Sequence, residues 1–212
     1  MNTDDLIASL GADMTPVRPG LLTNGVMLGL ASGAVLTVML FAALWGVRSD
    51  PAAIYSDMAL FAKTMLPLAL GTMALPWMLA QARPAGQSRV RHALWALPAV
   101  LVLLVAATLI ATPAPAWPMA LQGKSIMTCL VSIPALSAPI LAGLLVALRR
   151  GAPEHPMRCG MVAGLTAAGF AAAVYSLYCI ENSPLFYGTW YTLAILCVAG
   201  VGAIAGRVTL KW

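Results

Sequence analysis

The sequence predicts an all-α fold: an integral membrane bundle of six transmembrane helices joined by short loops. Of its 212 residues, 61% are hydrophobic and 9% are charged, whereas a soluble domain carries roughly 25% charged residues. Six apolar stretches are each long enough to cross a bilayer, which takes about 20 residues. The alternating segments of ~10 residues that are typical of a transmembrane β-barrel are missing. Together with short loops the six stretches use nearly the whole chain, which leaves no room for a separate soluble domain.

The expected spans are the charge-poor stretches. They cover about Leu21–Val47, Met58–Ala80, Ala93–Ala111, Ile126–Leu148, Cys159–Tyr178 and Tyr187–Gly206. Lys63 lies near the start of the second span, where a long basic side chain can snorkel to the interface. The chain thus divides into an amphipathic tail of residues 1–20, a transmembrane domain of residues 21–206 and a C-terminal end of residues 207–212.

The basic residues predict how these spans are oriented. With the N-terminus inside, the outer side carries Arg48, Lys63 and Lys124, and the cytoplasmic side carries Arg18, Arg83, Arg89, Arg91, Arg149, Arg150, Arg158, Arg207 and Lys211. Because basic loops stay in the cytoplasm, this bias predicts a multi-pass protein of the bacterial inner membrane with both termini cytoplasmic. Orientation also accounts for the net charge of +5, so we expect the lipid bilayer as a partner and no direct contact with nucleic acid.

Glycines recur at intervals of four residues in three spans: Gly25, Gly29 and Gly33, then Gly160 and Gly164, then Gly202 and Gly206. Small residues at this spacing let helix backbones approach closely in lipid. The pattern fits packing within the bundle, and it also fits a homodimer.

The tail differs from the rest of the chain. Thr3 can cap a short helix whose first turn holds Asp4 and Asp5, where the helix dipole favours acidic side chains. The apolar residues of this helix form one stripe, made of Leu6, Ile7, Leu10 and Met14. Such a stripe can dock into a groove on a cytosolic protein. Alternatively, the tail packs on the bundle or frays.

Topology sorts the four cysteines. Cys129 begins the fourth span and Cys179 ends the fifth, so both are expected near the outer face, at ends of consecutive antiparallel helices. Such a pair could form a disulfide in the oxidising periplasm, hold a soft ion such as Cu(I) or Zn, or remain two unrelated buried thiols. Cys159 and Cys197 are interpreted as small apolar residues.

The remaining polar residues predict no catalysis. Lys124 would favour a thiolate at the first of the outer cysteines, whereas Glu181 would oppose one at the second. His92 and His155 lack metal-ligand spacing, and the chain has no CxxC pair, nucleophile–base set or phosphate loop. We therefore expect a protein that is not an enzyme and needs no cofactor.

Two other functions stay open at this point. A small transporter or channel would need a polar path, for which the hydroxyl residues within the spans are candidates: Thr37, Thr64, Thr72, Ser132, Ser137 and Thr166. A membrane thiol-redox protein would use the outer cysteines, although it would normally have a second redox pair.

Several stretches together carry a family resemblance. Residues 3–10 read Thr-Asp-Asp-Leu-Ile-Ala-Ser-Leu, residues 16–19 read Pro-Val-Arg-Pro, and residues 148–156 read Leu-Arg-Arg-Gly-Ala-Pro-Glu-His-Pro. The most specific stretch is Tyr-Ser-Leu-Tyr-Cys-Ile-Glu-Asn-Ser-Pro-Leu-Phe at 175–186, followed by Trp190-Tyr191, Gly206-Arg207 and a terminal Lys-Trp. In these stretches the chain resembles the NrsF family, the negative regulators of sigma F.

The resemblance implies an inner-membrane anti-sigma factor, which holds an extracytoplasmic-function sigma factor and releases it under metal or oxidative stress. Carried onto this chain, the tail around Asp4–Met14 would bind the sigma factor, and Cys129 and Cys179 would be the sensing pair. Cys159 and Cys197 do not belong to the family pattern. We expect oxidation or metal capture to change the distance between the outer ends of spans four and five, after which the loop at Arg149–Arg158 and the tail would shift.

Overall fold

The computed structural model describes residues 2–12, 20–47, 58–86 and 88–211, and over these residues it contains helices and no strands. The elements are α1 (Thr3–Ala12), α2 (Leu21–Leu44), α4 (Met58–Gln81), α5 (Val90–Ala93), α6 (Ala96–Ala111), the 3-10 turn η1 (Ala114–Ala116), α7 (Trp117–Gln122), α8 (Ile126–Leu148), α9 (Pro156–Ser176) and α10 (Pro184–Thr209). Six helical stretches are long and apolar enough to cross a membrane, with α5 and α6 together forming the third. The predicted fold class is confirmed.

The helix ends differ from the predicted spans for local reasons. The first span ends at Leu44 rather than at residue 47, because Gly46 adopts a left-handed φ of +73° and its N–H bonds to the Phe41 carbonyl. The last two spans begin earlier than predicted, each with a proline (Pro156 and Pro184) in the first turn. Proline is favoured there because its missing N–H would have no helical partner.

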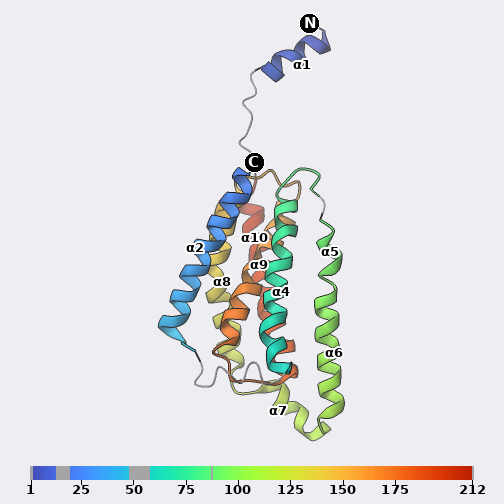
Figure 1. Ribbon diagram of the computed structural model, residues 1–212, viewed down its shortest axis with the longest axis vertical. Coiled ribbons are helices and arrows are strands. Elements are labelled where there is room, and N and C mark those ends of the chain that lie inside the picture. The colour runs from blue at the N-terminus through green and yellow to red at the C-terminus, as the bar shows by residue number, and fades with distance from the viewer. Residues whose placement is uncertain (1, 13–19, 48–57, 87, 212) are drawn as a thin grey trace.

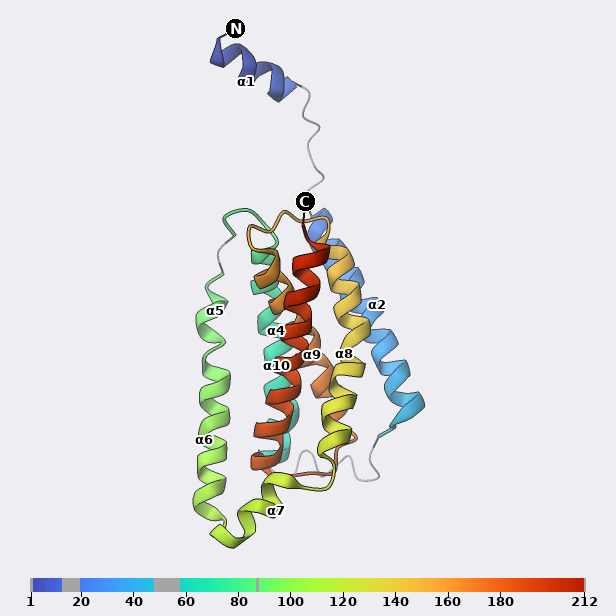
Figure 2. The ribbon, with the colours of Figure 1, turned by 180° about the vertical axis from the view of Figure 1, so that it is seen from behind.

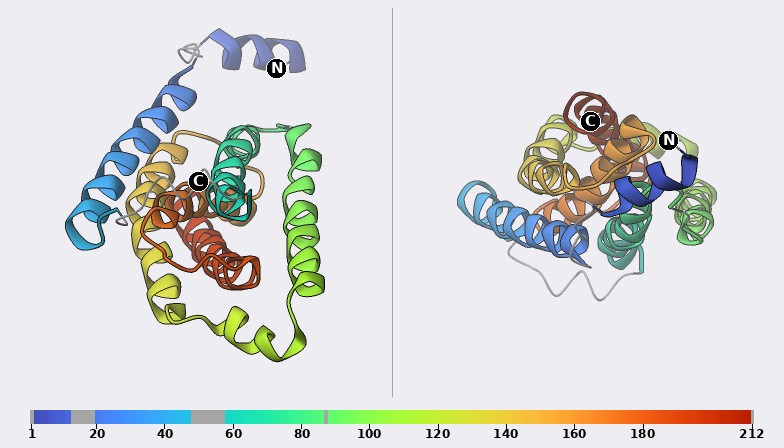
Figure 3. Two further views of the ribbon diagram at one scale, coloured as in Figure 1. Left: turned by 60° about the horizontal axis from the view of Figure 1, so that its bottom comes forward. Right: turned by 90° about the horizontal axis from the view of Figure 1, so that it is seen from above.

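The helices form a bundle in which α9 is central (Figures 1 and 2). It packs chiefly against α10, α4 and α8, while α2 packs on α8 at the far side. The views of Figure 3 show α5 and α6 on the opposite flank, and α6 buries none of its residues within the bundle. Large apolar side chains such as Leu103 and Ile110 face outward and are 69% and 88% exposed, as expected for a lipid-facing surface.

The glycine repeats pack inside the bundle. Gly29 of α2 lies directly against Gly143 of α8, and a Cβ added at Gly33 would lie 2.6 Å from the Cα of Ile140. Likewise, a Cβ at Gly160 of α9 would lie 2.7 Å from the Cα of Gly206 in α10. The prediction of packing within the bundle is confirmed, and these faces are occupied.

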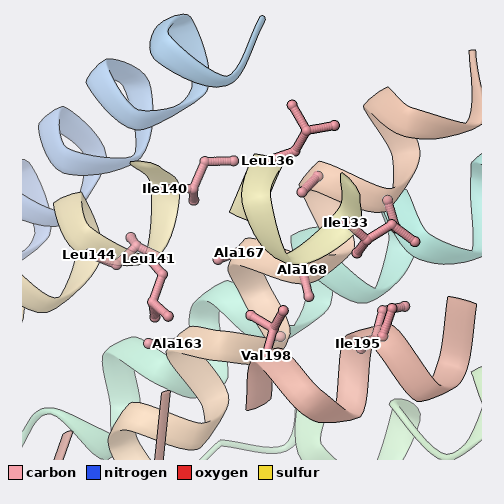
Figure 4. Close-up of a cluster of buried hydrophobic side chains, with 14 of the residues drawn as sticks. Ile133, Leu136, Ile140, Leu141, Leu144, Ala163, Ala167, Ala168, Ile195 and Val198 are labelled. Carbon is pink, nitrogen blue, oxygen red and sulfur yellow. The ribbon is translucent and has the colours of Figure 1, made fainter. Parts of the chain in front are cut away.

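The core is built from large side chains set against small ones (Figure 4). Helix α9 contributes mainly alanines, and α8 and α10 supply branched residues on either side: Ile133, Leu136, Ile140, Leu141, Leu144, Ala163, Ala167, Ala168, Ile195 and Val198. The alanines let three helices approach one another closely, which is the main source of packing energy in lipid.

The bundle has two distinct ends. Both termini lie at one end, which we call the tail end, and α7 lies at the other (Figure 1). We call this second end the thiol end, because residues 177–183, which join α9 to α10, and the start of α8 lie there with two of the cysteines.

Candidate functional site

The structure brings Cys129 and Cys179 together at the thiol end. Cys129 lies in the first turn of α8, and Cys179 follows the last turn of α9, its N–H bonding to the Tyr175 carbonyl at 3.2 Å. Both side chains are buried, at 0% and 2% exposure, and both are free thiols. The two thiols lie close enough to interact with each other. The expected proximity is present.

Lys63 joins this pair, against the sequence-based expectation. It is 2% exposed, and its Nζ donates to the carbonyls of Cys179 at 2.6 Å and Glu181 at 2.7 Å. The Lys63 side chain is thus buried against these carbonyls rather than exposed at the end of the bundle. Because α9 ends at Ser176, the carbonyls that follow need donors from elsewhere, and Lys63 supplies them from α4.

Two tyrosines complete the wall around the thiols. Tyr175 of α9 lies beside the Cys129 thiol and Tyr191 of α10 beside the Cys179 thiol, and their ring centroids are 5.8 Å apart. Both hydroxyls are buried and lack a regular hydrogen-bond partner among the described residues. Since sulfur is a weak acceptor, these hydroxyls are held beside the thiols with unused capacity to donate.

The charges around the pair are arranged differently from the prediction. The Glu181 carboxylate accepts from the backbone N–H of Lys124 at 2.7 Å and from the Ser125 hydroxyl at 3.4 Å, so it organises the start of α8. The Lys124 side chain is exposed. The cation that acts on the thiols is therefore Lys63, not Lys124.

These surroundings favour a thiolate at Cys179, which lies between the spans. The hydrogen bond from Cys129 holds the pKa of Cys179 well below its usual range. Burial opposes this shift, whereas the Lys63 ammonium and the Tyr191 hydroxyl support it. A thiolate is the reactive form of cysteine toward oxidants and soft metals.

The other cysteines and the histidines lie apart from this cluster. Cys159 is buried near the start of α9 at the tail end, and Cys197 is exposed on α10. His92 accepts a hydrogen bond from Arg91 at 3.1 Å, and His155 precedes α9. Across the described ranges, no three His, Cys, Asp or Glu side chains gather in a group that could hold a metal. A soft ion at Cys129 and Cys179 would therefore have two cysteine ligands among the described residues.

The tail contains the predicted helix, with one correction. The Asn2 carbonyl accepts the Leu6 N–H at 3.2 Å, so Asn2 rather than Thr3 caps α1. Asp4 and Asp5 lie in its first turn.

The apolar stripe of the tail is open to solvent where its side chains are described. Leu6 is 41% exposed and Ile7 is 63% exposed, and Leu10 also lies within α1. Met14 lies outside the described residues. Figure 1 shows α1 away from the bundle.

The turn that directly follows α4 is bonded to its neighbours at the tail end. The carbonyl of Ala82 accepts from the N–H of Ala152, and the N–H of Ala85 donates to the Glu154 carboxylate at 2.7 Å. Residues 149–155, which join α8 to α9, are thereby attached to the turn that directly follows the helix that carries Lys63.

The hydroxyls that a transport path would need are mostly engaged. Thr37 donates to the Leu136 carbonyl, and Thr64 shares a hydrogen bond of 2.8 Å with Ser176. Three further hydroxyls, those of Thr72, Ser137 and Thr166, donate to carbonyls of their own helices. Such bonding is common for Ser and Thr in membrane helices, and it gives the transporter alternative no support.

Sequence reasoning missed Lys63, Tyr175 and Tyr191 as members of this site. An ionisable residue inside a span is by default a functional candidate, and that signal was available for Lys63. The two tyrosines stood in the stretch that carried the family resemblance, but nothing in their spacing placed them beside the thiols.

Known proteins provide an independent comparison. The family described as NrsF, negative regulator of sigma F, matches residues 10–212. A protein of Azospira oryzae named "Probable anti-sigma-F factor NrsF" is 31% identical over 213 residues, and the "Anti-sigma-F factor NrsF" of Caulobacter vibrioides is 32% identical over 221 residues. Both alignments cover the full length of each protein. No solved structure matches the chain. The chain belongs to the NrsF family.

Proposed function

We propose that this protein is an inner-membrane anti-sigma factor that binds an extracytoplasmic-function sigma factor through its tail and releases it when Cys129 and Cys179 react. Its membership in the NrsF family, with two full-length relatives named as anti-sigma-F factors, supports the general role. The bias of basic residues toward the tail end supports cytoplasmic termini, where a sigma factor would be met.

The observation that carries the binding role is the exposure of Leu6 and Ile7 on α1. An isolated helix of 10 residues is marginal in water, and it gains stability when its apolar stripe is covered by a partner groove. Asp4 and Asp5, at its start, add negative charge that favours a basic rim on the partner. Leu10 and Met14 extend the same stripe in sequence.

The sensing role is supported by the position of the thiols. Cys129 belongs to α8, and Cys179 belongs to the segment that follows α9. A disulfide would draw the two sulfurs to about 2.05 Å, closer than in a thiol–thiol hydrogen bond, and a bound metal ion would fix a different separation. The stimulus releases the sigma factor only if it stabilises the arrangement that does not bind it.

The test is a pull-down from cells in mild detergent, with the tagged full-length protein beside a variant lacking residues 2–18. A full-length variant with Ala8→Asp, on the face of α1 opposite the stripe, serves as the matched control. We expect the full-length protein and the control to retain a sigma factor and the truncated variant to lose it. Retention by all three would keep the role and move the binding surface to the loops. Retention by none, with folded and inserted protein, would contradict the proposed function.

A further inference from the structure

We propose that Lys63 is the electrostatic partner of the cysteine pair and a positioning residue of the sensor, because its buried ammonium is fixed on the segment that carries Cys179. The inference rests on the proposed sensing role of the pair. Its chemistry can nevertheless be measured on the isolated protein without a sigma factor.

Three groups act on the Cys179 thiol, each from a different helix. Cys129 of α8 and the Tyr191 hydroxyl of α10 lie beside it, and the Lys63 ammonium acts on it from α4. Lys63 is fixed in place, because its Nζ bonds at 2.6 and 2.7 Å to the carbonyls of the same segment that carries the thiol. In a buried site with low dielectric, a fixed cation acts strongly on a nearby ionisable group.

The other titratable groups described near the thiols do not supply the positive charge that Lys63 supplies. Tyr175 lies beside Cys129, and Tyr178 packs on it with ring centroids 6.0 Å apart. The Tyr187 hydroxyl donates to the Ala59 carbonyl at 3.0 Å. The Glu181 carboxylate is directed to the backbone at Lys124. Among the described residues, Lys63 is the cation that acts on both thiols.

Oxidation changes the charge of this pair. With a two-electron thiol oxidant such as diamide, the Cys179 thiolate and the Cys129 thiol form an S–S bond. The pair gives up two electrons and the proton of the Cys129 thiol, and the diazene takes these with one further proton from water to become a hydrazine. The pair thereby passes from a charge of −1 to zero, and Lys63 loses its attraction to it. Two thiolates bound to Cu(I) would keep the charge at −1.

The consequence reaches the other end of the bundle through α4. Lys63 bonds α4 to residues 179 and 181 at the thiol end, and the turn that follows α4 is bonded at Ala82 and Ala85 to residues 152 and 154 at the tail end. Loss of the negative charge weakens the first attachment while leaving the second intact. Helix α4, which carries Lys63, therefore couples the redox state of the two thiols to the position of the segments at the tail end.

The test is the pH dependence of alkylation of the pair by iodoacetamide, measured by mass spectrometry on purified protein in a Cys159→Ser, Cys197→Ser background. The variants are Lys63→Met, which removes the charge and the donor, and Lys63→Gln, which keeps a donor. Lys124→Met is the matched control, since that lysine lies at the same end with an exposed side chain.

In the parent protein we expect one thiol to react with a midpoint well below the ordinary value of about 8.5. We expect both Lys63 variants to raise this midpoint by at least ~1 unit, which lowers the rate at least ~10-fold at any pH below both midpoints, and we expect Lys124→Met to leave it unchanged. A parent midpoint at the ordinary value, or the same midpoint with and without the Lys63 charge, would overturn the inference. If Lys63→Met does not fold, the parent and Lys63→Gln profiles decide the question.

Failure of the sensing role would look different. If the alkylation midpoint depends on Lys63 but cells with Cys129→Ser and Cys179→Ser still respond to diamide, Lys63 is the partner of the thiols and the pair is not the sensor. If the double variant loses its response but the midpoint does not depend on Lys63, the pair is the sensor and this inference falls.

Discussion

The tail end and the thiol end of the bundle carry their polar groups in opposite ways. At the tail end, α1 exposes both apolar and acidic side chains, and the basic side chains that flank the spans include the exposed Arg149 and Arg150. At the thiol end, a lysine, two thiols and two tyrosine hydroxyls are buried together. A surface that recognises a protein must be accessible, whereas a chemical sensor gains from burial, because low dielectric strengthens the interactions that set its reactivity.

The first test of this contrast between the two ends removes the two buried thiols. Replacing both Cys129 and Cys179 by serine should abolish induction by diamide completely while leaving retention of the sigma factor unchanged, because α1 is untouched. Induction is measured with a reporter of the sigma factor, and the Cys159→Ser, Cys197→Ser variant is the control. Unchanged induction in the Cys129/Cys179 variant would show that the thiols do not control the tail end, and it would contradict the sensing role.

The second way is to change the exposed stripe. Ile7→Asp places a charge on the apolar face of α1 and should weaken sigma-factor binding at least ~10-fold, equivalent to about 1.4 kcal/mol. Ala8→Asp, one residue on and also exposed, should have little effect. Binding is measured by titration in detergent. Equal losses in both variants would show that charge, not the stripe, decides binding.

A third prediction concerns the close packing of α9 against α10. Gly160→Val forces a side chain against the backbone of Gly206 and should destabilise the bundle by about 1–3 kcal/mol. Gly200→Val is the matched control, because nothing lies within 4 Å of a Cβ at that position. Thermal unfolding in detergent measures both. Equal stability of the two variants would mean that α9 and α10 are not held together at this contact.

The smallest expected effect concerns a hydrogen bond near the thiol end. Thr64→Val removes the bond of 2.8 Å to Ser176, which joins α4 to α9, and should cost about 0.6 kcal/mol. Thr72→Val removes only bonds of Thr72 to its own helix and should cost less. The difference in unfolding midpoint between these two variants sharpens the estimate of how firmly α4 is attached beside Lys63.

Much of the fold follows from the sequence because hydropathy, loop charge and glycine spacing act locally or along one helix. The six spans and the glycine contacts of Gly29 and Gly160 were predictable for this reason. The position of Lys63 was not, because its partners lie on carbonyls 116 and 118 residues away. A lysine near a helix end has the same local pattern whether it reaches the interface or turns inward, and only the tertiary arrangement decides between these outcomes.

The central position of α9 has a consequence for how the protein is made. The helix on which α4 and α10 pack is the fifth of six to be synthesised. At 5–20 residues per second, the ~95 residues between the end of α4 and the end of α9 take roughly 5–20 s to emerge from the ribosome. During this interval α4 is in the membrane before the carbonyls of Cys179 and Glu181 exist to receive the Lys63 ammonium. The nascent chain therefore passes through a stage in which a charged residue depends on water, lipid headgroups or the insertion machinery, and completion of span five ends that stage.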